Sequence, residues 1–156
     1  MNAAQKATAR SEIRAVLDRF AVLARDDPCW DEIAKCYATD GIFRLPNGKE
    51  VAPTQIKEVL QGGGANYIRH HATSSDVKFI SSTEAKVETL FIAITDTAWP
   101  DHWGSWKDTF KVQPDGAWKI QYRSAAVENG APEGWYMQNY GKVHKSPKHG
   151  DPAYSV

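Results

Sequence analysis

The stretch WGSWKDTFKVQPDGAWKIQYR, residues 103–123, predicts two β-strands joined by a tight turn. Apolar and polar side chains alternate on both sides of Pro114-Asp115-Gly116, and such a cluster between alternating runs is a hairpin signal. Alternation assigns one set of side chains to an inner face: Trp106, Asp108, Phe110 and Val112. It assigns a second set to the face expected to meet solvent: Ser105, Lys107, Thr109 and Lys111. Asp108 therefore lies on the apolar side, where a carboxylate is costly unless it is paired or functional.

The same period of two extends toward the N-terminus from this hairpin. The predicted strands are residues 67–80, 84–96, 103–112 and 117–127. Earlier residues have helical spacing, and Ser11 and Asp27 are the expected N-caps of the first two helices. The remaining predicted elements are helices at residues 11–25, from Pro28 through Tyr37 and after Pro53, and a short strand at residues 42–45 that follows the Asp40-Gly41 turn.

Helices followed by a run of antiparallel strands are typical of the α+β class. A single, strongly curved sheet wrapped over three N-terminal helices would leave a pocket between the sheet and the helices. We expect the functional site in that pocket, because ligand sites are concave and mostly apolar.

The composition excludes several classes of function. The chain has 156 residues, enough for one domain, and its 19 Lys and Arg balance its 19 Asp and Glu. A net charge of zero argues against a nucleic-acid partner and gives no electrostatic reason for binding a membrane. No apolar run has the length of a membrane span or follows the pattern of a secretory signal, so a cytoplasmic protein is expected.

The two cysteines, Cys29 and Cys36, are seven residues apart. That spacing fits two turns of one helix, with Cα atoms about 10 Å apart, too far for a disulfide. We therefore expect two reduced thiols. No Cys/His cluster has the spacing of a metal site, and Gly62-Gly63-Gly64 lacks the Lys-Ser/Thr of a phosphate loop, so no metal and no cofactor are predicted.

Three strings carry a resemblance to a known family. They are residues 30–43 (WDEIAKCYATDGIF), residues 70–74 (HHATS) and residues 115–123 (DGAWKIQYR). Over residues 11–127 the chain resembles the SnoaL-like branch of the nuclear transport factor 2-like superfamily. The resemblance implies a cone-shaped, curved antiparallel or mixed sheet over three helices, a cystatin-like α+β barrel, in a domain of residues 1–128. Residues 129–156 would then be a C-terminal tail, serving as a lid or a subunit contact.

Within that superfamily the pattern looks closest to dehydrochlorinase- and dehydratase-type lyases, some of which use a His–Asp dyad with an assisting arginine. The matching positions hold Asp26, His70 and Arg123. The resemblance implies that His70 is the general base, that Asp26 orients it and that Arg123 stabilises negative charge. Imidazole titrates near neutrality and guanidinium stays charged, so these residue types suit those roles. Ala21 stands where the dehydrochlorinase has a lysine, which argues against dehydrochlorination itself.

Other residues near this trio have their own interpretations. Asp108 is either a structural carboxylate, paired with Arg123 or a tyrosine hydroxyl, or the acid/base, as an aspartate is in some SnoaL-like cyclases. His71 points away from His70 by parity, and we interpret it as structural. The residues expected to bind substrate are Tyr37, Tyr67, Trp103 and Trp106.

The leading hypothesis for function is a cofactor-independent lyase, of the dehydratase or elimination type, or an isomerase. Its substrate would be a small, hydrophobic, cyclic molecule. One alternative is a non-catalytic protein resembling the small (beta) subunit of aromatic ring-hydroxylating dioxygenases. Another is a SnoaL-like polyketide cyclase that uses Asp108.

The second half of the strand at residues 84–96 is apolar on both faces. One face carries Leu90, Ile92 and Ile94, and the other carries Val87, Phe91 and Ala93. A half-exposed antiparallel strand normally alternates apolar with polar residues, so we predict a homodimer or homotrimer joined through the outer sheet face. The aromatic residues of the tail are expected to close the pocket or clasp a neighbouring subunit: Trp135, Tyr136 and Tyr140.

Overall fold

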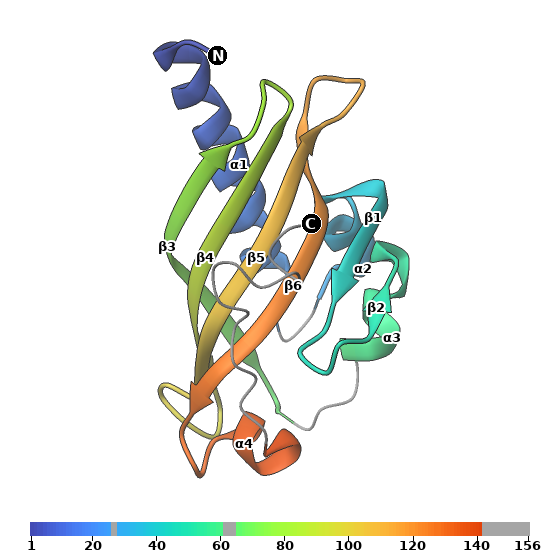
Figure 1. Ribbon diagram of the computed structural model, residues 1–156. Helices are drawn as coiled ribbons and strands as arrows, with labels where there is room; N and C mark the ends of the chain where they lie inside the picture. The colour runs from blue at the N-terminus through green and yellow to red at the C-terminus, as the bar shows by residue number, and fades with distance from the viewer. Residues whose placement is uncertain (26–27, 61–64, 142–156) are drawn as a thin grey trace.

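The computed structural model describes residues 1–25, 28–60 and 65–141, which form an α+β fold around one curved, mixed sheet of six strands (Figure 1). Its helices are α1 (Ala3–Leu23), α2 (Trp30–Ala34), α3 (Ile56–Leu60), which follows a 3-10 turn at Pro53–Gln55, and α4 (Trp135–Tyr140). Its strands are β1 (Tyr37–Arg44), β2 (Glu50–Val51), β3 (Ile68–Phe79), β4 (Glu84–Thr95), β5 (His102–Val112) and β6 (Trp118–Gly130). The strand order is β2-β1-β6-β5-β4-β3. None of the described helices is long and apolar enough to cross a membrane.

The register of the antiparallel strands β3 to β6 decides which side chains face inward. His70 on β3 lies opposite Ala93 on β4, and Ala93 lies opposite His102 on β5. Directly paired residues point to the same side of a sheet, and Ala93 is fully buried, so both histidines belong to the inner face. The four predicted long strands are confirmed, with ends shifted by at most three residues.

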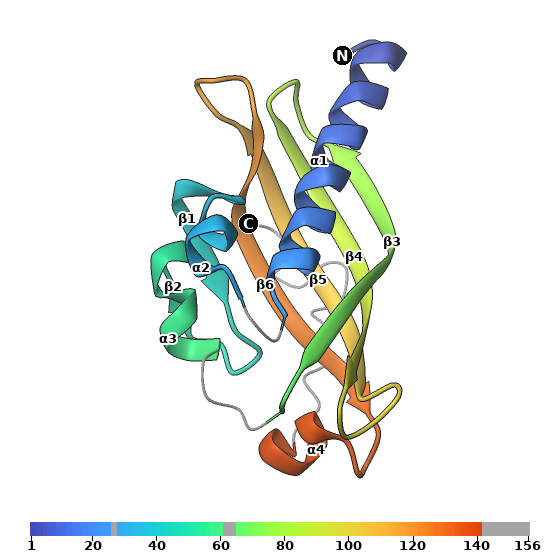
Figure 2. The ribbon, with the colours of Figure 1, turned by 180° about the vertical axis from the view of Figure 1, so that it is seen from behind.

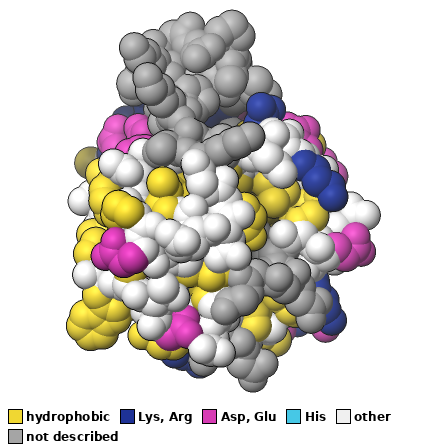
Figure 3. Space-filling view, turned by 90° about the horizontal axis from the view of Figure 1, so that it is seen from below, with side chains coloured by type: hydrophobic (Ala, Val, Ile, Leu, Met, Phe, Trp, Pro, Cys, Tyr) yellow, Lys and Arg dark blue, Asp and Glu magenta, His cyan; other side chains and the backbone are white. Residues whose placement is uncertain are grey.

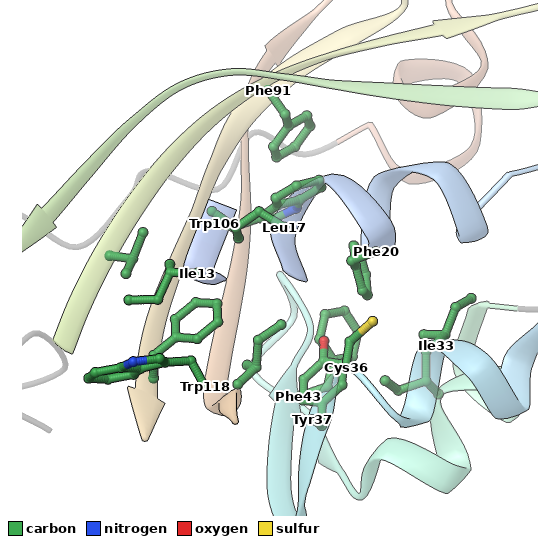
Figure 4. Close-up of a cluster of buried hydrophobic side chains, with 14 of the residues drawn as sticks. Ile13, Leu17, Phe20, Ile33, Cys36, Tyr37, Phe43, Phe91, Trp106 and Trp118 are labelled. Carbon is green, nitrogen blue, oxygen red and sulfur yellow. The ribbon is translucent and has the colours of Figure 1, made fainter. Parts of the chain in front are cut away.

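Helix α1 lies across the inner face of the sheet and supplies the centre of the core (Figure 2). Its Ile13, Leu17 and Phe20 are buried at helical spacing, as predicted. They gather with Phe91 and Trp106 from the sheet (Figure 4). The inner face of the sheet is therefore tightly packed beneath α1. A site can form where the strands extend past the end of α1, beyond Phe20.

The first helix begins at Ala3, so the expectation that it starts at residue 11 with Ser11 as its cap is wrong. Asn2 caps it instead. The Asn2 side chain accepts a hydrogen bond from the Gln5 backbone, and the Gln5 side chain accepts one from the Asn2 backbone. This reciprocal capping box satisfies two backbone donors that a helix start leaves unpaired.

The second helix is shorter than predicted, because α2 ends at Ala34 and β1 begins at Tyr37. Tyr37 therefore lies in a strand and not on a helix face, and Asp40-Gly41 lies inside that strand and not in a turn. Strand β1 pairs in parallel with β6, where Tyr37 lies opposite Ile120. A partner so distant in the chain is invisible to local spacing. Asp27, the predicted cap of the second helix, lies outside the described residues.

The two cysteines do not share a helix, contrary to the prediction. Cys29 precedes α2 and Cys36 follows it. Both thiols are free, as expected.

The outer face of β5 is only partly exposed, which corrects the prediction of a solvent face. Ser105 and Thr109 are buried. The Ser105 hydroxyl donates to the Glu128 carboxylate at 2.9 Å, and the Lys86 ammonium donates to the Thr109 hydroxyl at 2.9 Å. Long side chains of β4 and β6 thus cover the short ones of β5.

The chain keeps regular structure beyond residue 127, where the sequence predicted none. Strand β6 continues to Gly130, so the boundary predicted at residue 128 falls inside a strand. Helix α4 follows at the end of the sheet, beside the connection between β4 and β5 (Figure 1). The rest of the predicted tail, residues 142–156, lies outside the described residues.

Candidate active site

His70 occupies the inner face of β3, among aromatic rings. Its ring centroid lies 5.3 Å from that of Phe91, 5.5 Å from that of His102 and 6.0 Å from that of Trp106. Neither nitrogen of the ring is hydrogen-bonded to another described residue. Its predicted partner, Asp26, lies outside the described residues, so the His70–Asp26 dyad stays a prediction.

The structure does show a His–Asp pair, made by adjacent residues that sequence reasoning missed. His102 Nδ1 donates to Asp101 Oδ1 at 2.7 Å, and both residues are buried. A carboxylate at Nδ1 makes this nitrogen the protonated one and leaves Nε2 as the base. The parity that put Trp106 and Asp108 on the inner face extends to position 102. The predicted strand began one residue too late to include it.

The two histidines differ in how readily they take a proton. Burial, helped by the neighbouring His102, lowers the pKa of His70 from its ordinary 6.5 to about 3. Burial also lowers the pKa of His102, but there the Asp101 carboxylate opposes the shift. Two imidazoles this close repel each other's charge, so near neutral pH at most one of them is positively charged. Asp101 favours His102 as the one that carries it.

Asp101 keeps its negative charge in the interior because several donors bind it. Burial alone would raise its pKa, but hydrogen bonds from His102, Thr95 and the Tyr136 backbone hold the pKa below the ordinary value. The Thr95 hydroxyl donates to Oδ2 at 2.8 Å. Asp101 is therefore a buried carboxylate that is ionised and fully engaged.

Arg123 and Asp108 form a buried ion pair on β6 and β5. Arg123 Nε and Nη2 donate to the two oxygens of Asp108 at 2.8 Å and 2.7 Å, and neither side chain is exposed. Burial raises the pKa of Asp108, and the guanidinium opposes that rise. The interpretation of Asp108 as a carboxylate paired with Arg123 is thus confirmed as geometry. A catalytic role for either residue stays a prediction.

Aromatic rings enclose the remaining side of the guanidinium. Arg123 Cζ lies 4.2 Å from the ring centroid of Phe20 and 4.5 Å from that of Trp106. Its Nη1 has no hydrogen-bond partner among the described residues, and neither has the hydroxyl of Tyr37. Burial raises the pKa of Tyr37, which keeps this hydroxyl neutral. The positive charge of Arg123 also contributes to lowering the pKa of His70.

The other predicted residues are dispersed. Trp106 is buried next to His70, whereas Trp103 pairs with Ile92 on the outer face and does not reach the site. Tyr67 precedes β3, and the guanidinium carbon of Arg69 lies 5.5 Å from the centroid of the Tyr67 ring. The exposed His71 is on the outer face, as parity predicted.

Helix α4 covers the site at the end of the sheet. The rings of Trp135 and Tyr136 lie 6.1 Å and 4.8 Å from that of His102. Seen from this end, the visible hydrophobic side chains lie in separate patches (Figure 3). The side chains of Trp99 and Tyr140 remain largely exposed. Among the described residues, aromatic side chains thus lie over the inner histidines.

Two depressions in the described surface lie away from the histidines. One is lined by Tyr37, Pro53 and Lys119 among others, and another by Ser75, Asp76 and Glu88 among others. Neither includes His70, His102 or Arg123. Within residues 1–25, 28–60 and 65–141, no group of three or more His, Cys, Asp or Glu is placed to hold a metal ion.

Comparison with protein families decides the family. The model of the SnoaL-like domain matches residues 5–124. The chain belongs to the SnoaL-like family. No curated protein sequence matches it.

Several solved structures have the same fold as this chain, although their sequences are at most 20% identical to it. A putative scytalone dehydratase from Novosphingobium aromaticivorans is 20% identical, over 83% of this chain and 91% of its own, with a TM-score of 0.69. The hexachlorocyclohexane dehydrochlorinase LinA-type3 from Novosphingobium barchaimii is 10% identical, over 94% of this chain and 100% of its own, with a TM-score of 0.72. ActVI-ORFA from Streptomyces coelicolor is 15% identical, over 76% of this chain and 96% of its own, with a TM-score of 0.63. These likenesses confirm the predicted α+β fold.

Proposed function

We propose that this SnoaL-like protein is a cofactor-independent lyase of the dehydratase type, acting on a small, hydrophobic, cyclic molecule. The observation that carries the proposal is the pair of inward-facing histidines, His70 and His102, with ring centroids 5.5 Å apart. His102 is hydrogen-bonded to the Asp101 carboxylate, whereas no carboxylate among the described residues is hydrogen-bonded to His70. Neighbouring groups whose environments push their pKa values apart are suited to act as an acid and a base.

The two imidazoles would divide the work of an elimination. Neutral His70 takes the proton from the carbon next to the one that carries the hydroxyl, and the C–H electron pair becomes the new double bond. His102, protonated and held by Asp101, donates its Nε2 proton to the departing oxygen, which leaves as water. Proton transfer from His70 to His102 restores the starting state. With no leaving group, the same pair would move a proton between carbons, which is the isomerase form of the hypothesis.

The surroundings of the pair support an apolar substrate. Phe91 and Trp106 lie beside His70, and Trp135 and Tyr136 lie beside His102. An apolar enclosure also strengthens electrostatic interactions at the reacting atoms. Two proteins of the same fold support an elimination as the reaction: a putative scytalone dehydratase and a hexachlorocyclohexane dehydrochlorinase.

Asp26 and Arg123 keep supporting roles in this proposal. Asp26 is expected to orient His70 and raise its basicity, so Asp26→Asn should slow turnover. The charge of Arg123 disfavours a second proton on His70. We do not assign the acid/base role to Asp108, because both its oxygens already accept hydrogen bonds from Arg123.

The test is a search for water loss from a panel of cyclic β-hydroxy ketones, with 3-hydroxycyclohexanone and its fused-ring analogues as probes. Elimination yields a conjugated enone, which is followed by its ultraviolet absorbance. Wild-type protein should accelerate the reaction of at least one probe, and His70→Ala and His102→Ala should each lower that rate about 10²–10⁴-fold. His71→Ala is the matched control, since His71 is exposed on the outer face of the same strand. The proposal would be refuted if the wild type accelerated the reaction of no probe, or if His70→Ala or His102→Ala kept full activity.

A further inference from the structure

One buried carboxylate joins the second histidine to the helix that covers the site. Asp101 Oδ1 accepts from His102 Nδ1 at 2.7 Å and from the Tyr136 backbone at 3.1 Å. Asp101 Oδ2 accepts from the Thr95 hydroxyl at 2.8 Å and from the Trp135 backbone at 2.5 Å. Two donors therefore come from the sheet side of the site, and two from the first turn of α4.

The approach of α4 to this carboxylate is close enough to require glycine. A Cβ atom added to Gly134, the residue before α4, would lie 2.9 Å from Asp101 Oδ2 and 3.0 Å from the Ala131 carbonyl oxygen. A larger residue at this position must displace either the Asp101 carboxylate or the start of α4, and either shift weakens their contact. Docking of α4 thus depends on the contact with Asp101 itself.

The same docking sets the environment of His102. When α4 is docked, the Tyr136 ring covers the His102 imidazole. The backbone N–H groups of Trp135 and Tyr136 then bind the same Asp101 carboxylate that accepts from His102 Nδ1. When α4 leaves, the imidazole is less buried and the carboxylate is less shared. Both changes favour the protonated form of His102. The titratable groups around this ring are Asp101 on its own strand, His70 on β3 and Tyr136 on α4.

We propose that Asp101 is a positioning residue that couples the closure of α4 to the proton state of His102. It holds His102 with Nδ1–H toward itself and Nε2 free, and it holds α4 closed through the same two oxygens. The coupling is reciprocal: closing α4 makes His102 release its proton more readily, and protonating His102 loosens α4. The proposal rests on the proposed function only in giving His102 a catalytic task.

The experiment compares two glycine variants and needs no substrate. Gly134→Ala displaces the start of α4 from Asp101, whereas Gly141→Ala strains the far end of α4, where Gly141 has a φ of 55°. Long-range ¹H–¹⁵N NMR of the imidazole gives the tautomer and the titration midpoint of His102. Hydrogen exchange of the Trp135 and Tyr136 amides gives the opening of α4.

The wild type should show His102 with its proton on Nδ1. Gly134→Ala should speed exchange of both amides by about tenfold or more and raise the titration midpoint of His102. Gly141→Ala should leave that midpoint unchanged. Asp101→Asn should also speed exchange, but it should lower the midpoint and populate the Nε2–H tautomer, because the charge is gone. Opposite midpoint shifts in two variants that both open α4 would not arise from a purely structural role.

A wild-type His102 with its proton on Nε2 would overturn the proposal. Two results for Gly134→Ala would also overturn it. In one, the Trp135 and Tyr136 amides exchange faster but the titration midpoint of His102 does not change; in the other, these amides exchange at the wild-type rate. If Asp101→Asn does not fold, the two glycine variants decide alone. An inactive protein that shows the coupling would refute the proposed function and support this inference. An active one without the coupling would do the reverse.

Discussion

Removing the carboxylate of Asp108 should destabilise the protein severely, because it strands the charge of Arg123 in the core. Both side chains are fully buried, and the guanidinium already has one donor, Nη1, without a partner among the described residues. Breaking a buried ion pair from one side costs about 3–5 kcal/mol, since the remaining charge has no compensation. A domain of ordinary stability has only about 5–15 kcal/mol to lose.

The assay is urea unfolding followed by circular dichroism. With a slope of about 2 kcal/mol per molar urea, Asp108→Ala should lower the unfolding midpoint by about 1.5–2.5 M. The double variant Asp108→Leu/Arg123→Met should recover most of that loss, because it removes both charges and fills the space with apolar atoms.

Asp18→Asn is the matched control for the loss of a carboxylate. Asp18 pairs with Arg14 at 2.8 Å on the surface of α1, where both side chains are about half exposed. Such exposed pairs contribute about 0–1 kcal/mol, so its midpoint should hardly move. A comparably small shift for Asp108→Ala would refute the reasoning, and so would a double variant no more stable than the single one.

Three further predictions concern the site, the sheet and the assembly. Turnover should be greatest at mildly acidic pH. His102 must be protonated, and because its pKa lies below the ordinary 6.5 it loses that proton as the pH rises toward neutrality, whereas His70, with a pKa of about 3, stays neutral. A rate that keeps rising above pH 7 would contradict the assignment. Gly104→Ala should abolish soluble folded protein, as judged by circular dichroism, because the new Cβ would lie 1.9 Å from the Ala126 carbonyl oxygen. A folded variant with the wild-type urea unfolding midpoint would show instead that β5 and β6 can separate at this position. The chain should form a homodimer or homotrimer through the outer sheet face, where Ile92 is 41% exposed, and Ile92→Lys should dissociate it; light scattering that gives a wild-type monomer at micromolar concentration would rule this out.

Alternation along the chain was enough to predict the main sheet and the face on which its key residues lie. The hairpin at residues 103–123 put Asp108 inside, and parity put His71 on the face opposite His70. These predictions succeed because a strand has a period of two and one buried face, which are local properties of the backbone. Local strings also identified the SnoaL-like family, which the family model confirms over residues 5–124.

Which of the inward residues meet was decided only by the tertiary structure. Asp108 contacts Arg123 because the register of β5 and β6 places them opposite each other, between a shift in register at Thr109/Phe110 and another at Trp103/Gly104. Asp101 is next to His102 in the chain, but it binds the start of α4 through a contact between residues 34 positions apart, where Gly134 allows a close approach. Register and close approach depend on strands and loops packing together in space, and a period along the chain carries no information about either.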